Sequence, residues 1–114
     1  MARRSPSPTM RDATMVAPLT AERRAAALSE LKSWHYDAER KAFLRTITLR
    51  NFSEAFGLMT RIALAAEKED HHPDWSNVYS RLEICLTTHD AGDVSDRDIR
   101  LAKVIDELVS RDER

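Results

Sequence analysis

The chain has 114 residues, of which 42% are hydrophobic and 32% charged, with a net charge of −1. This length and balance suit one globular domain, and the small net charge argues against nucleic acid or a membrane surface as the partner. Cys85 is the only cysteine, which rules out an internal disulfide and a zinc site built on several thiolates. With no apolar run of about 18 residues, we expect no membrane span and a cytoplasmic location.

Residues 1–18 differ in composition from the rest of the chain. They contain three prolines, scattered serine and threonine, and three arginines against one acidic residue. We interpret them as a flexible tail and place the folded domain at residues 19–114. An arginine-rich start is also typical of organelle targeting peptides, although the prolines oppose the amphipathic helix that such peptides form. Met15 is an alternative natural start.

The first predicted elements are a helix and a hairpin. Thr20 can cap a helix that runs to Lys32, with an apolar stripe of Ala27, Leu28 and Leu31. Residues 34–50 contain aromatic and β-branched side chains in partial alternation, interrupted by a charged turn at residues 37–40. This pattern predicts two strands, with one face formed by Phe43, Ile47 and Leu49.

A second helix is predicted after Asn51, which can cap it. Apolar residues recur there at spacings of three and four, namely Phe52, Phe56, Met59, Ile62 or Ala63, and Ala66. Leu58 and Ala65 widen the apolar arc, so the helix could cover a sheet on one side and a second subunit on the other. A wide stripe buried within one subunit explains the periodicity equally well.

The remainder of the chain predicts a connector, a strand and a third helix. Helical backbone is disfavoured before Pro73, so we interpret residues 71–77 as a connector and residues 78–89, which alternate in polarity, as one long strand. Ser95 and Asp98 form a potential capping box for a helix that closes the chain. The order of elements predicts an α+β fold, with an antiparallel sheet covered on one face by helices.

Three of the four histidines are candidates for proton transfer. His71 and His72 lie in the proline-restricted connector and His89 lies at the end of the predicted strand, whereas His35 stands alone. Imidazole exchanges protons near neutral pH, so a group of histidines in a polar setting suggests general acid/base chemistry. Taken singly, each of these histidines would more often be a surface or structural residue.

Acidic residues surround the histidine pair. Glu67, Glu69 and Asp70 crowd the end of the second helix, where the helix dipole favours cations instead. A carboxylate beside His71 or His72 would favour the protonated imidazole, which indicates a functional site. The alternative interpretation is a solvated helix end in which the acids pair with Lys68.

Other chemistries receive less support from the sequence. Adjacent histidines on a helix would point about 100° apart, unlike the ligand pair of a zinc-protease helix, so we expect no metal. Cys85 falls within a predicted strand, which favours a packing role over a nucleophilic one. Gly57 and Gly92 are the only glycines, so a phosphate-binding glycine loop and a nucleotide cofactor are not expected.

Four segments carry a resemblance to a known family: residues 67–75, residues 77–79, the pair Thr88–His89, and residues 95–98. In these residues the chain resembles the pterin-4a-carbinolamine dehydratases, also called dimerisation cofactors of a homeodomain transcription factor. The resemblance covers nearly all of residues 19–110. It implies a four-stranded antiparallel sheet with three helices packed on one face.

The resemblance also implies a reaction and its residues. Members dehydrate 4a-hydroxytetrahydrobiopterin to quinonoid dihydropterin during tetrahydrobiopterin recycling, without a cofactor or metal, and so serve an aromatic amino acid hydroxylase. By the family pattern, His71, His72 and His89 are catalytic; the substrate-binding residues would be Glu67, Asp70, Pro73, Trp75, Thr87 and Thr88. Separately, we expect a homodimer or homotetramer through the helix that follows Asn51, because that helix has more apolar surface than one sheet face can cover. The rival functions are a dimerisation or transcriptional cofactor without catalysis and a pterin-binding regulatory protein.

Overall fold

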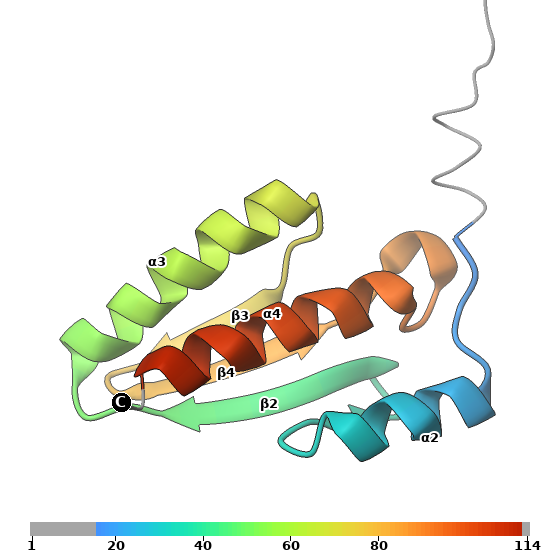
Figure 1. Ribbon diagram of the computed structural model, residues 1–114, viewed down its shortest axis with the longest axis horizontal. Helices are drawn as coiled ribbons and strands as arrows, with labels where there is room; N and C mark the ends of the chain where they lie inside the picture. Colours follow the sequence, from blue (N-terminus) through green and yellow to red (C-terminus); the bar gives the residue numbers. More distant parts are fainter. Residues whose placement is uncertain (1–15, 113–114) are drawn as a thin grey trace, which may run out of the picture.

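The computed structural model describes residues 16–112, and in this range the sheet and its helices form two layers (Figure 1). The elements, in chain order, are α2 (Ala21–Glu30), β1 (His35–Asp37), β2 (Ala42–Thr48), α3 (Phe52–Glu69), β3 (Asp74–Val78), β4 (Arg81–Leu86), the short 3₁₀ helix η1 (His89–Ala91) and α4 (Asp96–Asp112). The strands pair antiparallel in the order β1-β2-β4-β3, which confirms the predicted α+β class. No helix in the described range is long and apolar enough to cross a membrane.

The core lies between the sheet and the helices. Alternate residues of β4, such as Leu82 and Leu86, point into it from the sheet, as does Phe43 of β2. Leu58 of α3 and Leu101 of α4 meet them from the helical layer, and all five side chains are fully buried. The helices cover this face of the sheet, and the opposite face is open to solvent.

The first helix and the hairpin form as the sequence predicts. The Thr20 hydroxyl accepts the N–H of Arg23 at 3.1 Å, and α2 ends at Glu30, two residues before the expected end. Arg45 lies between Phe43 and Ile47 on the helix-facing side of β2. This charge is tolerated under the helices because Arg45 forms an ion pair with Asp106 of α4.

The prediction for α3 was right in extent and right that Ile62 and Ala66 are buried, but wrong for the two phenylalanines. The Asn51 side chain accepts the N–H of Glu54 at 2.9 Å, as expected of a cap, but Phe52 and Phe56 are 50% and 55% exposed. The buried line consists of Ala55, Leu58, Ile62 and Ala66. Both lines have helical spacing, and the smaller side chains allow α3 to approach its neighbours more closely, which residue size alone does not reveal.

The prediction of one long strand over residues 78–89 is wrong. The prediction that the connector extends as far as residue 77 is also wrong. Residues 74–78 form β3, and a turn at Tyr79 and Ser80 reverses the chain into β4. Tyr79 adopts a positive φ of 51°, which an alternating pattern does not predict. The alternation crosses the turn without interruption, and this hid the turn in the sequence.

The capping box at the start of α4 is confirmed. The N–H of Ser95 donates to the Asp98 carboxylate at 2.9 Å, and the Ser95 hydroxyl accepts the N–H of Arg97 at 3.2 Å. Both capping residues are buried, with Asp98 completely inaccessible. The first turn of α4 is therefore fixed against the end of the sheet.

Candidate active site at the end of the sheet

A left-handed residue turns the chain from α3 toward the end of the sheet. Asp70, with a φ of 55°, follows the last helical residue, and the N–H of His71 donates back to the Ala66 carbonyl at 3.1 Å. Pro73 then keeps the chain extended as it enters β3. His71 and His72 therefore lie in a short, conformationally restricted link between α3 and the sheet.

His71 is held by a buried hydrogen-bond network. Its Nε2 lies 2.6 Å from Asp98 Oδ1, and its side chain is 11% exposed. The Thr88 hydroxyl donates to the second oxygen of the same carboxylate at 2.7 Å and lies 2.6 Å from the Ser95 hydroxyl. The end of α3, the end of β4 and the start of α4 are thus joined through one side chain.

His72 and His89 are more accessible to solvent. His72 Nε2 lies 2.8 Å from Glu67 Oε1, one turn back on α3, and both side chains are largely exposed. His89 begins η1, and its Nε2 lies 3.9 Å from a carboxylate oxygen of Asp74. Gly92, with a φ of 73°, ends η1 and returns the chain toward α4.

The three histidines line one cavity of about 330 Å³. Its wall consists of Asp70, His71, His72, Pro73, Asp74, Thr87, Thr88, His89, Asp90 and Arg97. Glu67 does not line the cavity, and its side chain contacts the wall through the hydrogen bond to His72. The volume of the cavity falls within the range of small-molecule sites.

Some residues of this wall were not expected from the sequence, and two expected residues, Glu67 and Trp75, do not belong to it. Asp74, Asp90 and Arg97 belong to the cavity but were not predicted as site residues, although Asp74 and Arg97 lie in segments that carry the family resemblance. Trp75 does not line it and instead borders a cavity on the open face of the sheet. Trp75 pairs with Ile84 and packs against the hydrophobic core, whereas Asp74 pairs with Cys85 on the opposite face of the sheet and lines both cavities.

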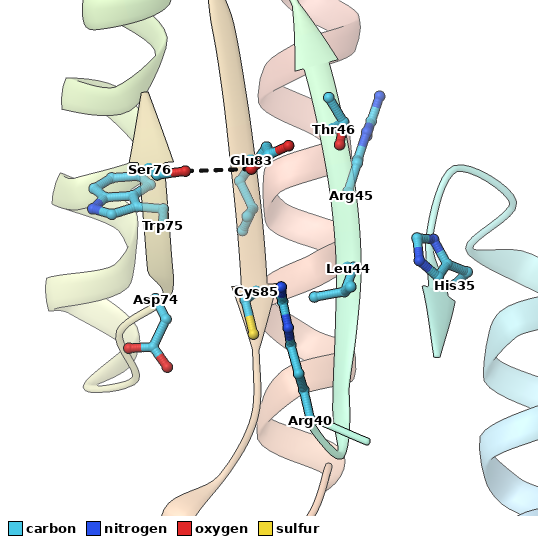
Figure 2. Close-up of a pocket in the computed structure, with 11 residues that line it drawn as sticks. His35, Arg40, Leu44, Arg45, Thr46, Asp74, Trp75, Ser76, Glu83 and Cys85 are labelled. Atoms are coloured by element: carbon cyan, nitrogen blue, oxygen red, sulfur yellow. Dashed lines mark hydrogen bonds between the residues drawn. The ribbon is translucent and has the colours of Figure 1, made fainter. Parts of the chain in front are cut away.

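The cavity on the open face of the sheet, also of about 330 Å³, has a different character (Figure 2). His35, Leu44 and Cys85 are neighbours across its floor, and Ser76 donates to Glu83 at 3.4 Å above them. Burial, helped by the carboxylate of Asp74, raises the pKa of the Cys85 thiol, which makes it a poor nucleophile at neutral pH. The proton-transfer groups gather at the other cavity, which we therefore take as the candidate site.

The geometry of the histidine cavity suits proton exchange with a small polar ligand. Two imidazoles are hydrogen-bonded to carboxylates and the third lies near a carboxylate, so each ring has a polar partner that can orient it. No three histidine, cysteine or carboxylate side chains within residues 16–112 are grouped closely enough to hold a metal ion.

Comparison with known proteins identifies the family. The model of the family described as pterin 4 alpha carbinolamine dehydratase matches residues 17–108. Proteins of Afipia carboxidovorans and Rhizorhabdus wittichii, both provisionally named pterin-4-alpha-carbinolamine dehydratase, are 57% and 55% identical; each alignment covers 82% of this chain, and 93% and 96% of the relative.

A solved structure shares the fold. The crystal structure of a transcriptional coactivator/pterin dehydratase from Brucella melitensis superimposes with a TM-score of 0.77 at 38% sequence identity, covering 80% of this chain and 97% of that one. The residues that the family model matches include the whole histidine cavity. The chain belongs to the pterin-4a-carbinolamine dehydratase family.

Proposed function

We propose that the protein dehydrates a 4a-hydroxytetrahydropterin to the quinonoid dihydropterin. In this reaction the bond between C4a and its hydroxyl oxygen breaks, the neighbouring ring nitrogen N5 loses a proton, and a double bond forms between C4a and N5. One group must protonate the departing hydroxyl so that it leaves as water, and another must accept the proton from N5. Regenerating the pterin in this way would serve an aromatic amino acid hydroxylase.

The observation that carries the proposal is the gathering of three imidazoles around one cavity, two of them bonded to carboxylates. Imidazole can act as an acid or as a base near neutrality, so neighbouring imidazoles could supply both proton transfers. A protein that only binds a partner has no comparable need for this arrangement. Membership of the dehydratase family supports the same reaction.

The individual roles of the three histidines are part of the proposal. We assign proton exchange to His71 and His89, and positioning of the pterin to His72, which is held by Glu67. A carboxylate of Glu67 or Asp70 would then accept hydrogen bonds from the amino-pyrimidine edge. The hydroxyls of Thr87 and Thr88 already bond to the Lys41 carbonyl and to Asp98, so both residues would shape the pterin pocket more than bind through those hydroxyls.

A stopped-flow assay tests this function directly. 4a-Hydroxytetrahydropterin is generated by a hydroxylase and mixed with the protein, and its loss is followed by absorbance. We expect faster loss than in buffer alone, in proportion to protein concentration. Loss at the buffer rate, with folded protein present, would contradict the dehydratase function.

A second candidate function is a dimerisation cofactor that acts through α3. Phe52 and Phe56 are half exposed on its outer side with ring centroids 5.7 Å apart, and Leu64 is 69% exposed further along. Such an apolar strip on a surface helix is typical of a protein interface. The solved relative from Brucella melitensis carries the word coactivator in its name, which is consistent with this role.

Self-association through the same strip is the simplest use of it. We expect light scattering at micromolar concentration to show a dimer or tetramer, because pairing α3 with a second copy would bury both phenylalanines. Phe56→Lys should shift the protein to monomer by placing a charge in that interface. Val78→Lys, at an equally exposed valine on the edge strand β3, is the matched control and should leave the assembly intact. A monomeric wild type, or dissociation caused by Val78→Lys alone, would refute an interface on α3.

A further inference from the structure

The carboxylate of Asp98 is the most enclosed charged group near the histidine cavity. It is 0% exposed, and it lies behind His71 without lining the cavity itself. As a helix cap it needs to bond only to the N–H of Ser95. It makes two further hydrogen bonds, to His71 and to Thr88, that capping does not require.

The pattern of donors around this carboxylate fixes the proton on His71. One oxygen, Oδ2, accepts the N–H of Ser95 at 2.9 Å and the hydroxyl of Thr88 at 2.7 Å. The other oxygen, Oδ1, faces His71 Nε2 at 2.6 Å. An ionised carboxylate can only accept hydrogen bonds, so Nε2 must carry a proton.

The other ring nitrogen is then the one available to a ligand. No residue in the described range bonds to Nδ1 of His71, and the imidazole lines the cavity. When His71 is neutral, a proton on Nε2 leaves the lone pair on Nδ1. We propose that Asp98 is a positioning residue that holds His71 as the Nε2–H tautomer, so that Nδ1 is the base that accepts the proton from the substrate.

Replacing Asp98 by asparagine separates this role from helix capping. An asparagine has one acceptor oxygen, which can still take the N–H of Ser95 and the Thr88 hydroxyl at the position of Oδ2. Its NH₂ group then faces His71 Nε2. Two donors cannot share a hydrogen bond, so the imidazole must move its proton to Nδ1 and lose the free lone pair there.

Asp96 provides the matched control. It begins α4 two residues before Asp98, its side chain is 55% exposed, and it pairs with Arg23 and not with a histidine. Asp96→Asn removes the same charge from the same helix turn. We therefore expect it to reproduce any effect of losing one negative charge in this helix turn, but not an effect on His71.

Nitrogen-15 NMR of the imidazoles tests the tautomer without any assay of turnover. Spectra are recorded at pH 8.5, with the His71 signals identified by their absence in His71→Ala. In the wild type and in Asp96→Asn we expect a protonated Nε2 and an unprotonated Nδ1, and in Asp98→Asn the reverse. A protonated Nδ1 in the wild type overturns the proposal, and this result needs no variant at Asp98 to fold.

Kinetics test the consequence for the reaction, which rests on the proposed dehydratase function. Asp98→Asn, checked for folding by circular dichroism, should lower kcat by roughly 10²- to 10⁴-fold with KM changed less than about threefold, whereas Asp96→Asn should retain wild-type values. If the wild type does not turn over pterin, the proposed function fails while the NMR result still decides the role of Asp98. Wild-type kcat in a folded Asp98→Asn protein, or an unchanged His71 tautomer in that variant, overturns the positioning role.

Discussion

His71→Ala and His89→Ala should each lower kcat by roughly ten- to ten-thousand-fold. A positioned acid or base contributes about 10² to 10⁴ to the rate, and a neighbouring imidazole can partly substitute for a missing one. His71 and His89 line the same cavity from different segments of the chain, so replacing one leaves the other in place. Steady-state kinetics should show a smaller effect on KM. His72→Ala should show the opposite pattern, with binding weakened more than turnover, since His72 is assigned to positioning.

His35→Ala is the matched control for these variants. His35 lies on the open face of the sheet, away from the histidine cavity, so its loss should leave kcat unchanged. Treating the wild type with a chelator should also have no effect if imidazoles carry the protons. Loss of activity on chelation with recovery on adding zinc would contradict catalysis by imidazole, as would full turnover in a folded His71→Ala/His89→Ala double variant.

Phe43→Ala should destabilise the fold by about 3–5 kcal/mol, the usual cost of deleting a buried aromatic ring. Phe43, the second residue of β2, is 0% exposed and packs edge-on against Tyr36, with ring centroids 6.2 Å apart. The helices above it are fixed to the sheet by several contacts, so they cannot fully collapse into the space left behind. Urea denaturation at one fixed protein concentration would measure the loss as a lower midpoint.

Leu44→Ala is the control, one residue further along the same strand. Leu44 points to the open face of the sheet and is half-buried, so its truncation leaves a wider surface cavity and not an internal one. We expect a loss of about 1 kcal/mol or less, in line with partial burial. Equal losses in the two variants would show that the core does not lie on the helix-facing side of β2.

The fold could be predicted from local patterns wherever one pattern had a single interpretation. Asn51 and the pair Ser95–Asp98 marked helix starts correctly, because a cap is chemistry between residues close in sequence. The turn at Tyr79 was missed because a residue with positive φ there is neither glycine nor asparagine. The exposure of Phe52 and Phe56 on α3 was missed because the buried side of a helix depends on what packs against it.

The candidate site divides in the same way. His71, His72 and His89 stood out because imidazoles near carboxylates suggest proton transfer, whatever the fold. Arg97 could not be found in this way, since one arginine in a helix rich in charges carries no local signal. The link from Asp98 to His71 spans 27 residues of sequence and exists only once α4 docks against the end of α3.

That link makes the site depend on the last helix of the chain. During synthesis, a ribosome-bound chain that has emerged only as far as η1 already contains all three histidines, yet it has no Asp98 to hold His71. Activity should therefore appear late in translation, with the docking of α4, and local unfolding of that helix in the finished protein should abolish it reversibly. Hydrogen exchange at the amides of the first turn of α4 should slow when a pterin binds. The ligand would favour the state in which α4 is docked, although this helix forms only a small part of the pocket wall.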